Sequence, residues 1–353
     1  MIIWEEGSGW HPFSWLFHLK GKMPEFYGNS YWSKFTMLLG SLRSVAAGGL
    51  PDLTGNESYL SQTRIRANLG VTEKKDVIYA FRGLHPAGQR LITPDYKLTD
   101  QQVFIDATRA CIEETGDLLV LGFCDKIYNI NRVDNLPSWV PDWSTRIRMF
   151  PLTSVIAKFN TFPGDWSFKS SGKYKHKTEQ RSVDPRLHVK GRLVETISAI
   201  HPRRFEDFDP HFTTKDKDPF QVNAMVKDMT EGCDWRLKDV SEERILLLLT
   251  LKRHGLVKEY HEGSLGGLEN VLHHARWRRV CRGRQDEGAI GLVPSPSVVG
   301  DQVWVLHGCP TPVVLRKKSR TEFMLVGACY WEGMMDRETC DWRENDASDI
   351  QLV

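Results

Sequence analysis

The run LPSWVPDWS at residues 136–144 closes a stretch that begins with DVIYAFRGL at residues 76–84. The closing run holds two prolines and two tryptophans, a composition that fits neither a helix nor a central strand, because proline lacks the amide hydrogen that both use. We expect a rigid extended loop there. Large aromatic side chains dominate core burial, so Trp139 and Trp143 should be largely buried and Asp142 hydrogen-bonded to backbone.

Two helices are expected upstream of this loop. Thr99 and Gln102 have the spacing of a capping box, and Gly116 follows at a position suited to a helix end. Asp76 is expected to cap a shorter helix. The inward face of the longer helix should hold four small or apolar residues: Val103, Ala107, Ala110 and Cys111.

Composition divides the chain into four segments. Residues 1–70 are rich in aromatic residues, with apolar positions that recur at helical spacing between 31 and 46. Residues 71–168 form a helical segment, and residues 169–186 include a polar mixture typical of a solvated linker. Residues 187–353 are expected to form an α+β region.

The C-terminal region shows a change from helix signals to strand signals. Residues 187–200 are β-rich and predict one long or two short strands, whereas residues 219–256 and 266–282 have helix-like patterns. From residue 300 onward, three apolar runs separated by polar turns predict an antiparallel β-meander. The predicted fold class is α+β, with a helical N-terminal half and a mixed helix and antiparallel β-meander C-terminal half.

Charge and composition exclude several classes of protein. The net charge of +2 creates no field that would attract nucleic acid or an acidic membrane, so we expect neither as a partner. The start of the sequence has no signal peptide pattern, and no apolar run approaches the ~20 residues of a membrane span. Seven scattered cysteines without a C-x-x-C pair favour reduced thiols and a cytoplasmic protein.

The known motifs for hydrolases, nucleotide binding and zinc proteases are absent from the sequence. Asp142 is the one weak catalytic candidate, because a carboxylate between aromatics can have a raised pKa, although it can equally accept backbone hydrogen bonds in a turn. Weak ligand-binding candidates are Trp139, Trp143 and the basic pair Arg278 and Arg279. We expect no metal site and no cofactor.

Several motifs occur here in the order in which they recur in fungal heterokaryon-incompatibility (HET) proteins. The run KDVIYAFRGL at 75–84 resembles the segment that follows the effector domain in that family, and PDY at 94–96, ETG at 114–116 and LPSWVPDWS follow in order. The C-terminal runs GLVP at 291–294, PVVLR at 312–316 and LVGACY at 325–330 extend the resemblance.

The resemblance implies a protein related to the region C-terminal to the HET domain. The family's HET domain carries motifs resembling A-L-S-Y-x-W-G and I-D-x-x-C-I-N-Q, and neither occurs in residues 1–75. The HET domain resembles TIR folds and triggers programmed cell death, and that activity has no matching residues in this chain. The chain therefore looks like the partner half of such a protein without its effector half.

We expect a recognition or regulatory module of fungal self/non-self discrimination, and a non-enzymatic protein is more likely than an enzyme. Its expected partners are other proteins, such as HET-type allorecognition partners. The alternative is an enzyme or accessory protein of a fungal specialised-metabolite pathway that uses an aromatic-lined pocket near Asp142. A third possibility is a truncated reading frame with its HET domain upstream. Solid packing around Asp142 would count against the pocket.

Overall fold

A computed structural model describes residues 71–80, 82, 90–124, 133–145, 152, 168–172, 174–176, 184–204, 240–251, 275, 277–284, 289–335 and 346–353. The chain divides into two compact units, Met1–Thr54 and Gly55–Val353, and every described residue belongs to the second. The helix predicted at 31–46 lies outside the described residues, as does most of the predicted helical N-terminal half.

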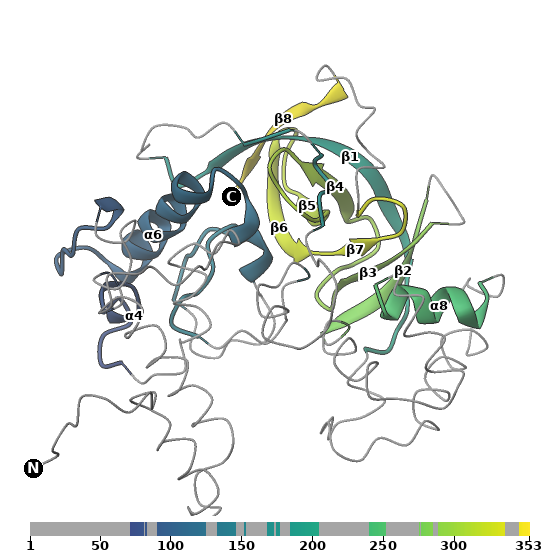
Figure 1. Cartoon of the computed structure of the whole chain (residues 1–353), viewed down its shortest axis with the longest axis horizontal. Helices are drawn as coiled ribbons and strands as arrows, with labels where there is room; N and C mark the ends of the chain where they lie inside the picture. The colour runs from purple at the N-terminus through teal and green to yellow at the C-terminus, as the bar shows by residue number, and fades with distance from the viewer. Residues whose placement is uncertain are drawn as a thin grey trace, which may run out of the picture. The chain divides into compact units, whose positions relative to one another are not determined.

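The helical elements are α4 (Asp76–Tyr79), α6 (Asp100–Thr115), the 3-10 helix η2 (Leu119–Phe123) and α8 (Glu242–Leu249). The strands are β1 (Leu187–Ile200), β2 (Arg278–Gly283), β3 (Ile290–Pro294), β4 (Gln302–Leu306), β5 (Val313–Lys317), β6 (Glu322–Ala328), β7 (Tyr330–Trp331) and β8 (Ser348–Leu352). Helices α4 and α6 lie to one side of the strands, whereas α8 lies beside β2 and β3 (Figure 1).

Helix α6 has the ends that the sequence predicts. The Thr99 hydroxyl accepts a hydrogen bond from the Gln102 amide at 3.2 Å, and Gly116 stops the helix in the left-handed conformation at φ 67°. The four residues predicted for its inward face are all buried, which confirms that assignment. The cap predicted for α4 is wrong by one residue, because Lys75 is the cap and Asp76 lies in the first turn.

Strand β1 is long enough to pair with three other strands. Residues 187–191 pair with β8, residues 191–196 with β4, and residues 197–200 with β2, all antiparallel. Because β4, β5, β6 and β8 also pair in that order, the strands β1, β4, β5, β6 and β8 close into a five-stranded ring. Strands β2, β3 and β7 extend from β1 as a second layer of the same sheet.

Gly191 is the point on β1 where pairing passes from β8 to β4. A Cβ atom there would lie 2.6 Å from Leu306 Cδ2 and 2.9 Å from the Val305 carbonyl oxygen. Atoms do not approach so closely without a shift of the neighbouring strand, so only glycine allows β1 and β4 to come together at this register.

The predicted meander is confirmed in its order, since β4, β5 and β6 are consecutive antiparallel neighbours. The sheet as a whole is mixed rather than antiparallel, because β8 joins β6 in parallel. Of the helix predicted for 219–256, the structure describes residues 240–251. Residues Glu242–Leu249 form α8, and the prediction is wrong at Thr250 and Leu251, which lie in a turn. The helix predicted for 266–282 is wrong over residues 278–282, which form β2 because their backbone pairs with β3.

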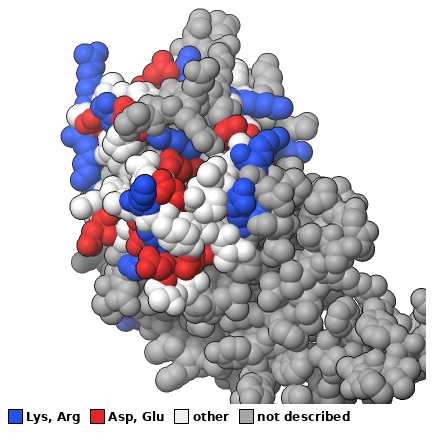
Figure 2. Space-filling view, turned by 90° about the vertical axis from the view of Figure 1, so that its left-hand side faces the viewer, with Lys and Arg blue, Asp and Glu red and all other residues white. Residues whose placement is uncertain are grey.

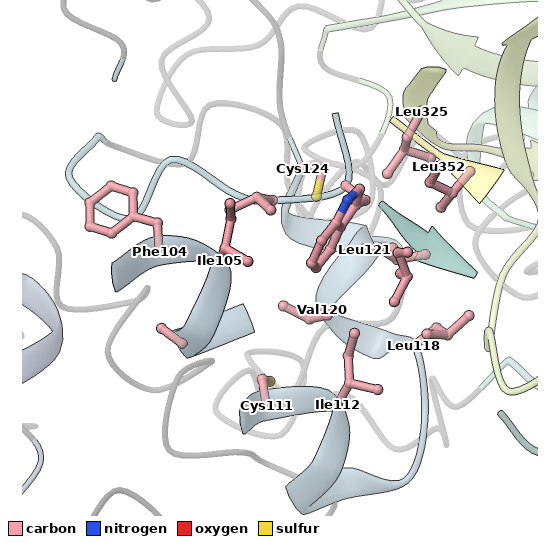
Figure 3. Close-up of a cluster of buried hydrophobic side chains, with 14 of the residues drawn as sticks. Phe104, Ile105, Cys111, Ile112, Leu118, Val120, Leu121, Cys124, Leu325 and Leu352 are labelled. Atoms are coloured by element: carbon pink, nitrogen blue, oxygen red, sulfur yellow. The ribbon is translucent and has the colours of Figure 1, made fainter. Parts of the chain in front are cut away.

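One hydrophobic core joins the helical segment to the barrel (Figure 3). Phe104 and Ile112 from α6, together with Leu121 from η2, pack in the same cluster as Leu325 of β6 and Leu352 of β8. A second cluster lies between the two layers of strands and includes Ile197, Val303, Val314, Val326 and Trp331. Strand β5 supplies both clusters from its two faces, so it is apolar along its buried part rather than alternating.

Candidate functional site

The loop at residues 136–144 lies in the first core. The side chains of Trp139 and Trp143 are both 0% exposed, which confirms the predicted burial. The Trp139 indole donates to the Pro185 carbonyl at 3.0 Å, and the Trp143 indole donates to the Thr108 hydroxyl of α6 at 3.2 Å. The two tryptophans therefore fix the loop to the residues just before β1 and to α6.

Asp142 sits between the two tryptophans and is only 3% exposed. One carboxylate oxygen accepts the Val133 amide at 2.9 Å. The other accepts the Ser144 amide at 3.1 Å and the Ser144 hydroxyl at 2.7 Å. The predicted backbone hydrogen bonding is confirmed, and it satisfies two amides of a turn that lies in the core.

Arg109 of α6 strengthens the same junction. Its guanidinium lies 5.6 Å from the centre of the Trp139 ring and donates to the Asp184 carbonyl. The Asp184 carboxylate in turn accepts the Arg186 side chain at 2.9 Å and the Arg186 amide at 3.0 Å, and these bonds hold the pKa of Asp184 well below its usual value. The start of β1 is thus tied to α6 through several polar contacts.

These contacts give the tryptophan loop a structural role. The indoles and the carboxylate that would line a pocket near Asp142 are covered by the rest of the core, and their polar atoms bond to protein groups. The aromatic residues near Asp142 are therefore packed in the core, and they do not line a pocket of the kind that the enzyme hypothesis requires. A catalytic role for Asp142 and a ligand-binding role for the tryptophans stay predictions that no described contact favours.

Arg278 and Arg279, the basic pair named as weak ligand-binding candidates, lie on a strand rather than in the predicted helix. They are neighbours on strand β2, so their side chains point to opposite faces of the sheet. Arg278 is 1% exposed, whereas Arg279 donates to the carbonyls of Ser295 and Ser297 at 2.7 and 2.6 Å. The pair therefore does not present one joint site to a ligand.

Arg279 is one of two arginines that hold the loop between β3 and β4, residues 295–301, which we name the clamped loop. Arg316 binds the Asp301 carboxylate with two bonds of 2.8 Å and donates to the Pro296 carbonyl at 2.9 Å. This ion pair raises the pKa of Arg316, and Asp301 itself is 2% exposed. Sequence reasoning missed the clamp, because Arg316 lies on β5 and Asp301 in the loop before β4, and only the pairing of β4 with β5 brings them together.

The clamped loop also hydrogen-bonds to β1. The Gly300 amide donates to the Ile197 carbonyl at 2.9 Å, and the Ile197 amide donates to the Asp301 carbonyl at 2.9 Å. The Asp301 carboxylate accepts the Val298 amide at 2.8 Å. These backbone and side-chain bonds restrain the loop, and Val298 and Val299 at its tip are 48% and 58% exposed.

The histidines and cysteines of the barrel are placed for packing. His307 stacks on Tyr174 with ring centres 4.6 Å apart. The Cys309 thiol is buried, and burial raises its pKa to about 12, which disfavours the thiolate that nucleophilic chemistry needs. Among the residues that the structure describes, no three His, Cys, Asp or Glu side chains lie close enough to hold a metal ion.

Within the described part of the chain, no helix is both long enough and apolar enough to cross a membrane. Burial raises the pKa of Cys281 and Cys329 as well, and all five cysteines that the structure describes are free thiols. Burial therefore disfavours the reactive thiolate form of Cys281 and Cys329, as it does for Cys309.

Comparison with known proteins agrees with this architecture. Residues 254–353 match the Het-6 beta-barrel domain family. These residues supply β2 to β8, whereas β1, which closes the ring, comes from the preceding part of the chain. No solved structure matches the chain.

A curated relative extends the similarity beyond the barrel. Heterokaryon incompatibility protein 6, OR allele, of Neurospora crassa is 24% identical over 364 aligned residues, which cover 80% of this chain and 51% of the relative. The chain thus spans about half the length of the curated relative it matches. The barrel match and this relative support the resemblance read from the sequence motifs: residues 254–353 are similar to the Het-6 beta-barrel domain, and the chain is similar to a fungal heterokaryon incompatibility protein.

Proposed function

We propose that this chain is a recognition or regulatory module in heterokaryon incompatibility, the self/non-self response for which its relative is named, and that it has no effector activity of its own. The observation that carries the proposal is the packing of its most distinctive motif. Trp139, Asp142 and Trp143 serve the core and leave no reactive group facing a substrate. A module of this kind acts by binding.

The partners of such a module are other proteins in the cytoplasm, namely the allorecognition partners of HET-family proteins. The near-balanced net charge of +2 supports a protein partner over nucleic acid or a membrane. The clamped loop supports the same proposal, because a rigid loop with exposed apolar side chains loses little conformational entropy when it binds.

The proposal is tested by expressing the chain alone in a fungal host and by deleting its gene in one of two incompatible strains. The chain alone is expected to leave viability unchanged, because the proposed module acts by binding. Deletion is expected to change the survival of fused cells, because recognition is lost. Vital-dye counting of fused and unfused cells measures both outcomes.

The matched variant keeps the fold but loses the exposed apolar side chains of the clamped loop. The double substitution Val298→Ser and Val299→Ser alters only the tip of the clamped loop, where both side chains are about half exposed. Rapid cell death from the wild-type chain alone would overturn the proposal, as would fused-cell survival that is unaffected by deletion.

A further inference from the structure

The turn between β5 and β6 is a basic segment of the barrel surface. Residues 316–321 have the sequence RKKSRT, with four cations in the first five positions and no acid. Arg316 is bound to the Asp301 carboxylate, whereas the residues from 317 to 321 are all exposed. The other three cations of the turn form no ion pair with any residue that the structure describes: Lys317, Lys318 and Arg320.

The surrounding acids do not cancel this charge. Glu322, which follows the turn, lies 3.5 Å from the guanidinium of Arg186. Figure 2 views the side of the molecule on which α4 and α6 lie, and there the Lys and Arg side chains are mixed with Asp and Glu. The whole chain carries a net charge of only +2. The turn is therefore a local basic surface in a chain whose charges are close to balance.

Ser319 lies at the tip of this turn and is exposed. The last pair of the β5–β6 ladder is Lys317 with Phe323, so residues 318–322 project beyond it. The Ser319 Oγ accepts the Glu322 amide at 3.2 Å, and the Ser319 amide donates to the Glu322 carbonyl at 3.2 Å. The first of these bonds uses the hydroxyl oxygen as an acceptor, and it leaves the hydroxyl proton available for transfer. An accessible hydroxyl is thus held at the end of a short hairpin.

An exposed serine that follows several cations has the charge pattern by which one class of protein kinase selects its substrates. Carboxylates in the substrate cleft of such a kinase bind the cations. In the reaction, the Ser319 oxygen bonds to the terminal phosphorus of a nucleoside triphosphate as the bond from that phosphorus to the leaving diphosphate breaks. The hydroxyl proton passes to the catalytic aspartate of the kinase. The kinase, the nucleoside triphosphate and Mg²⁺ come from outside, and this chain supplies the accepting oxygen.

The same turn is suited to hold the product. A phosphate group adds about −1.5 to −2 charge at pH 7 and three strong acceptor oxygens. The Glu322 amide already donates to the Ser319 oxygen and can donate to the phosphate, and Lys318 and Arg320 flank the serine in the chain. The Glu322 carboxylate, which would repel a phosphate, has the Arg186 guanidinium beside it. Phosphorylation therefore offsets about two of the three exposed positive charges of the turn and leaves the fold intact.

Thr321 offers a comparison within the same turn. It is exposed, and Lys318 and Arg320 precede it in the chain. Its carbonyl, however, accepts the Gln351 amide of β8 at 2.8 Å, whereas the Ser319 amide bonds within the turn. The turn must open locally to enter the cleft of a kinase, and bonds within the tip open at lower cost than bonds to a neighbouring strand. Ser319 is therefore the better acceptor of the two.

We propose that Ser319 is a phosphorylation site for a protein kinase that selects serines preceded by basic residues. The phosphate is held by the Glu322 amide and by the cations on either side of the serine. It acts as a charge switch, because the turn carries three exposed positive charges before the transfer and about one after it. Arg316 and Asp301 join the turn to the clamped loop, so the charge changes close to that loop. The site depends on the fold of the barrel and is independent of the proposed function.

Phosphorylation of the full chain by the catalytic subunit of cyclic-AMP-dependent protein kinase, with ATP and Mg²⁺, tests the site. Ser319 is expected to take up phosphate, and mass spectrometry of proteolytic peptides measures the fraction modified. The rate should lie within about tenfold of the rate for a synthetic peptide of residues 313–324, because a surface turn opens at little cost.

Three variants of the turn give the matched controls. Ser319→Ala should abolish the modification of the turn, whereas Thr321→Ala should leave the rate within about twofold of the wild type. Lys317→Ala with Lys318→Ala keeps the hydroxyl but removes two of the cations before it, and it should slow the reaction about tenfold or more. Circular dichroism confirms that each variant is folded.

Phosphorus NMR of the modified chain tests how the phosphate is held. The pKa of its second ionisation should be lower in the folded chain than in the phosphorylated peptide, because the Glu322 amide and the neighbouring cations stabilise the dianion. The peptide has the same residues, so the difference reports the fold. Arg320→Ala should raise this pKa, since it removes one of the cations. Urea denaturation should give the same midpoint with and without the phosphate.

The chain isolated from its fungal host is expected to carry phosphate on Ser319 in part of the molecules. The proposal is overturned if the kinase modifies the peptide but not the folded chain, if Thr321 takes the phosphate instead, or if the chain from the host carries none on Ser319. A phosphate that ionises as it does in the peptide would overturn the way in which the turn holds it. Fused-cell survival after gene deletion is measured separately, so a chain that is not phosphorylated leaves the proposed function intact.

Discussion

Replacing Asp142 by alanine is the sharpest perturbation of the tryptophan loop. The substitution removes the acceptors of the Val133 amide, at 2.9 Å, and of the Ser144 amide, at 3.1 Å. A buried donor without an acceptor costs about 1–3 kcal/mol. Water reaches Ser144 more easily than Val133, because Ser144 is half-buried and Val133 is buried.

We therefore expect Asp142→Ala to lower the free energy of unfolding by about 2–4 kcal/mol, and Asp142→Asn, which keeps one oxygen, by about half as much. The loss is a large share of the ~5–15 kcal/mol that stabilises a typical domain. Urea denaturation followed by tryptophan fluorescence measures it, with the midpoint expected to fall at an unchanged slope.

Asp134→Ala is the matched control, because Asp134 is an exposed acid of the same region and its loss should change stability by less than about 0.5 kcal/mol. The structural role of Asp142 would be refuted if Asp142→Ala were as stable as the wild type. It would be refuted equally if the substitution abolished an enzymatic activity of a protein that kept its full stability.

Three further predictions concern the barrel. Gly191→Ala should destabilise the protein by about 1–3 kcal/mol in the same denaturation assay, because its Cβ would meet Leu306 at 2.6 Å; wild-type stability would contradict the close approach. Arg316→Ala should lower the free energy of unfolding by about 3 kcal/mol, since it leaves the Asp301 carboxylate buried without its cation. Amide hydrogen exchange of residues 295–301 should become faster, and unchanged exchange would disprove the clamp. Burial lowers the pKa of His176. As the pH falls below about 6.5, the unfolded chain therefore binds a proton that the folded chain does not, and the free energy of unfolding falls. His176→Gln should flatten this pH dependence, and an unaltered slope would show that His176 is not its source.

Local signals in the sequence were sufficient for several elements. The ends of α6 follow from Thr99 and Gly116, because a capping hydroxyl and a left-handed glycine act over four residues or fewer. The burial of Trp139 and Trp143 follows from their size and from the prolines that keep the loop out of regular structure. Both features are decided within a few residues of the chain.

Features that depend on distant pairing were not predictable. The parallel contact of β6 with β8, and the closing of the ring by β1, join segments far apart in sequence, and their apolar patterns do not encode their partners. Arg278 shows the same limit, since a basic run next to helix-like sequence predicted a helix end, yet pairing with β3 makes it a strand and buries the side chain.

The choice of candidate site was limited in the same way, because distant pairing decides which side chains are exposed. The residues that sequence reasoning selected, Asp142 and its two tryptophans, are distinctive because the core requires them. The exposure of the valines in the clamped loop was not predictable from the sequence, because it depends on contacts from Arg279 and Arg316, which lie on two other strands. An exposed loop of this kind can be recognised only when the fold brings its supporting residues together.

The measurement that tests the central claim most directly is the survival of fused cells from two incompatible fungal strains, one of which lacks the gene for this chain. A recognition or regulatory module predicts that deletion changes survival and that the chain expressed alone kills no cells. Vigorous death from the chain alone, or survival that is identical with and without the gene, would contradict it.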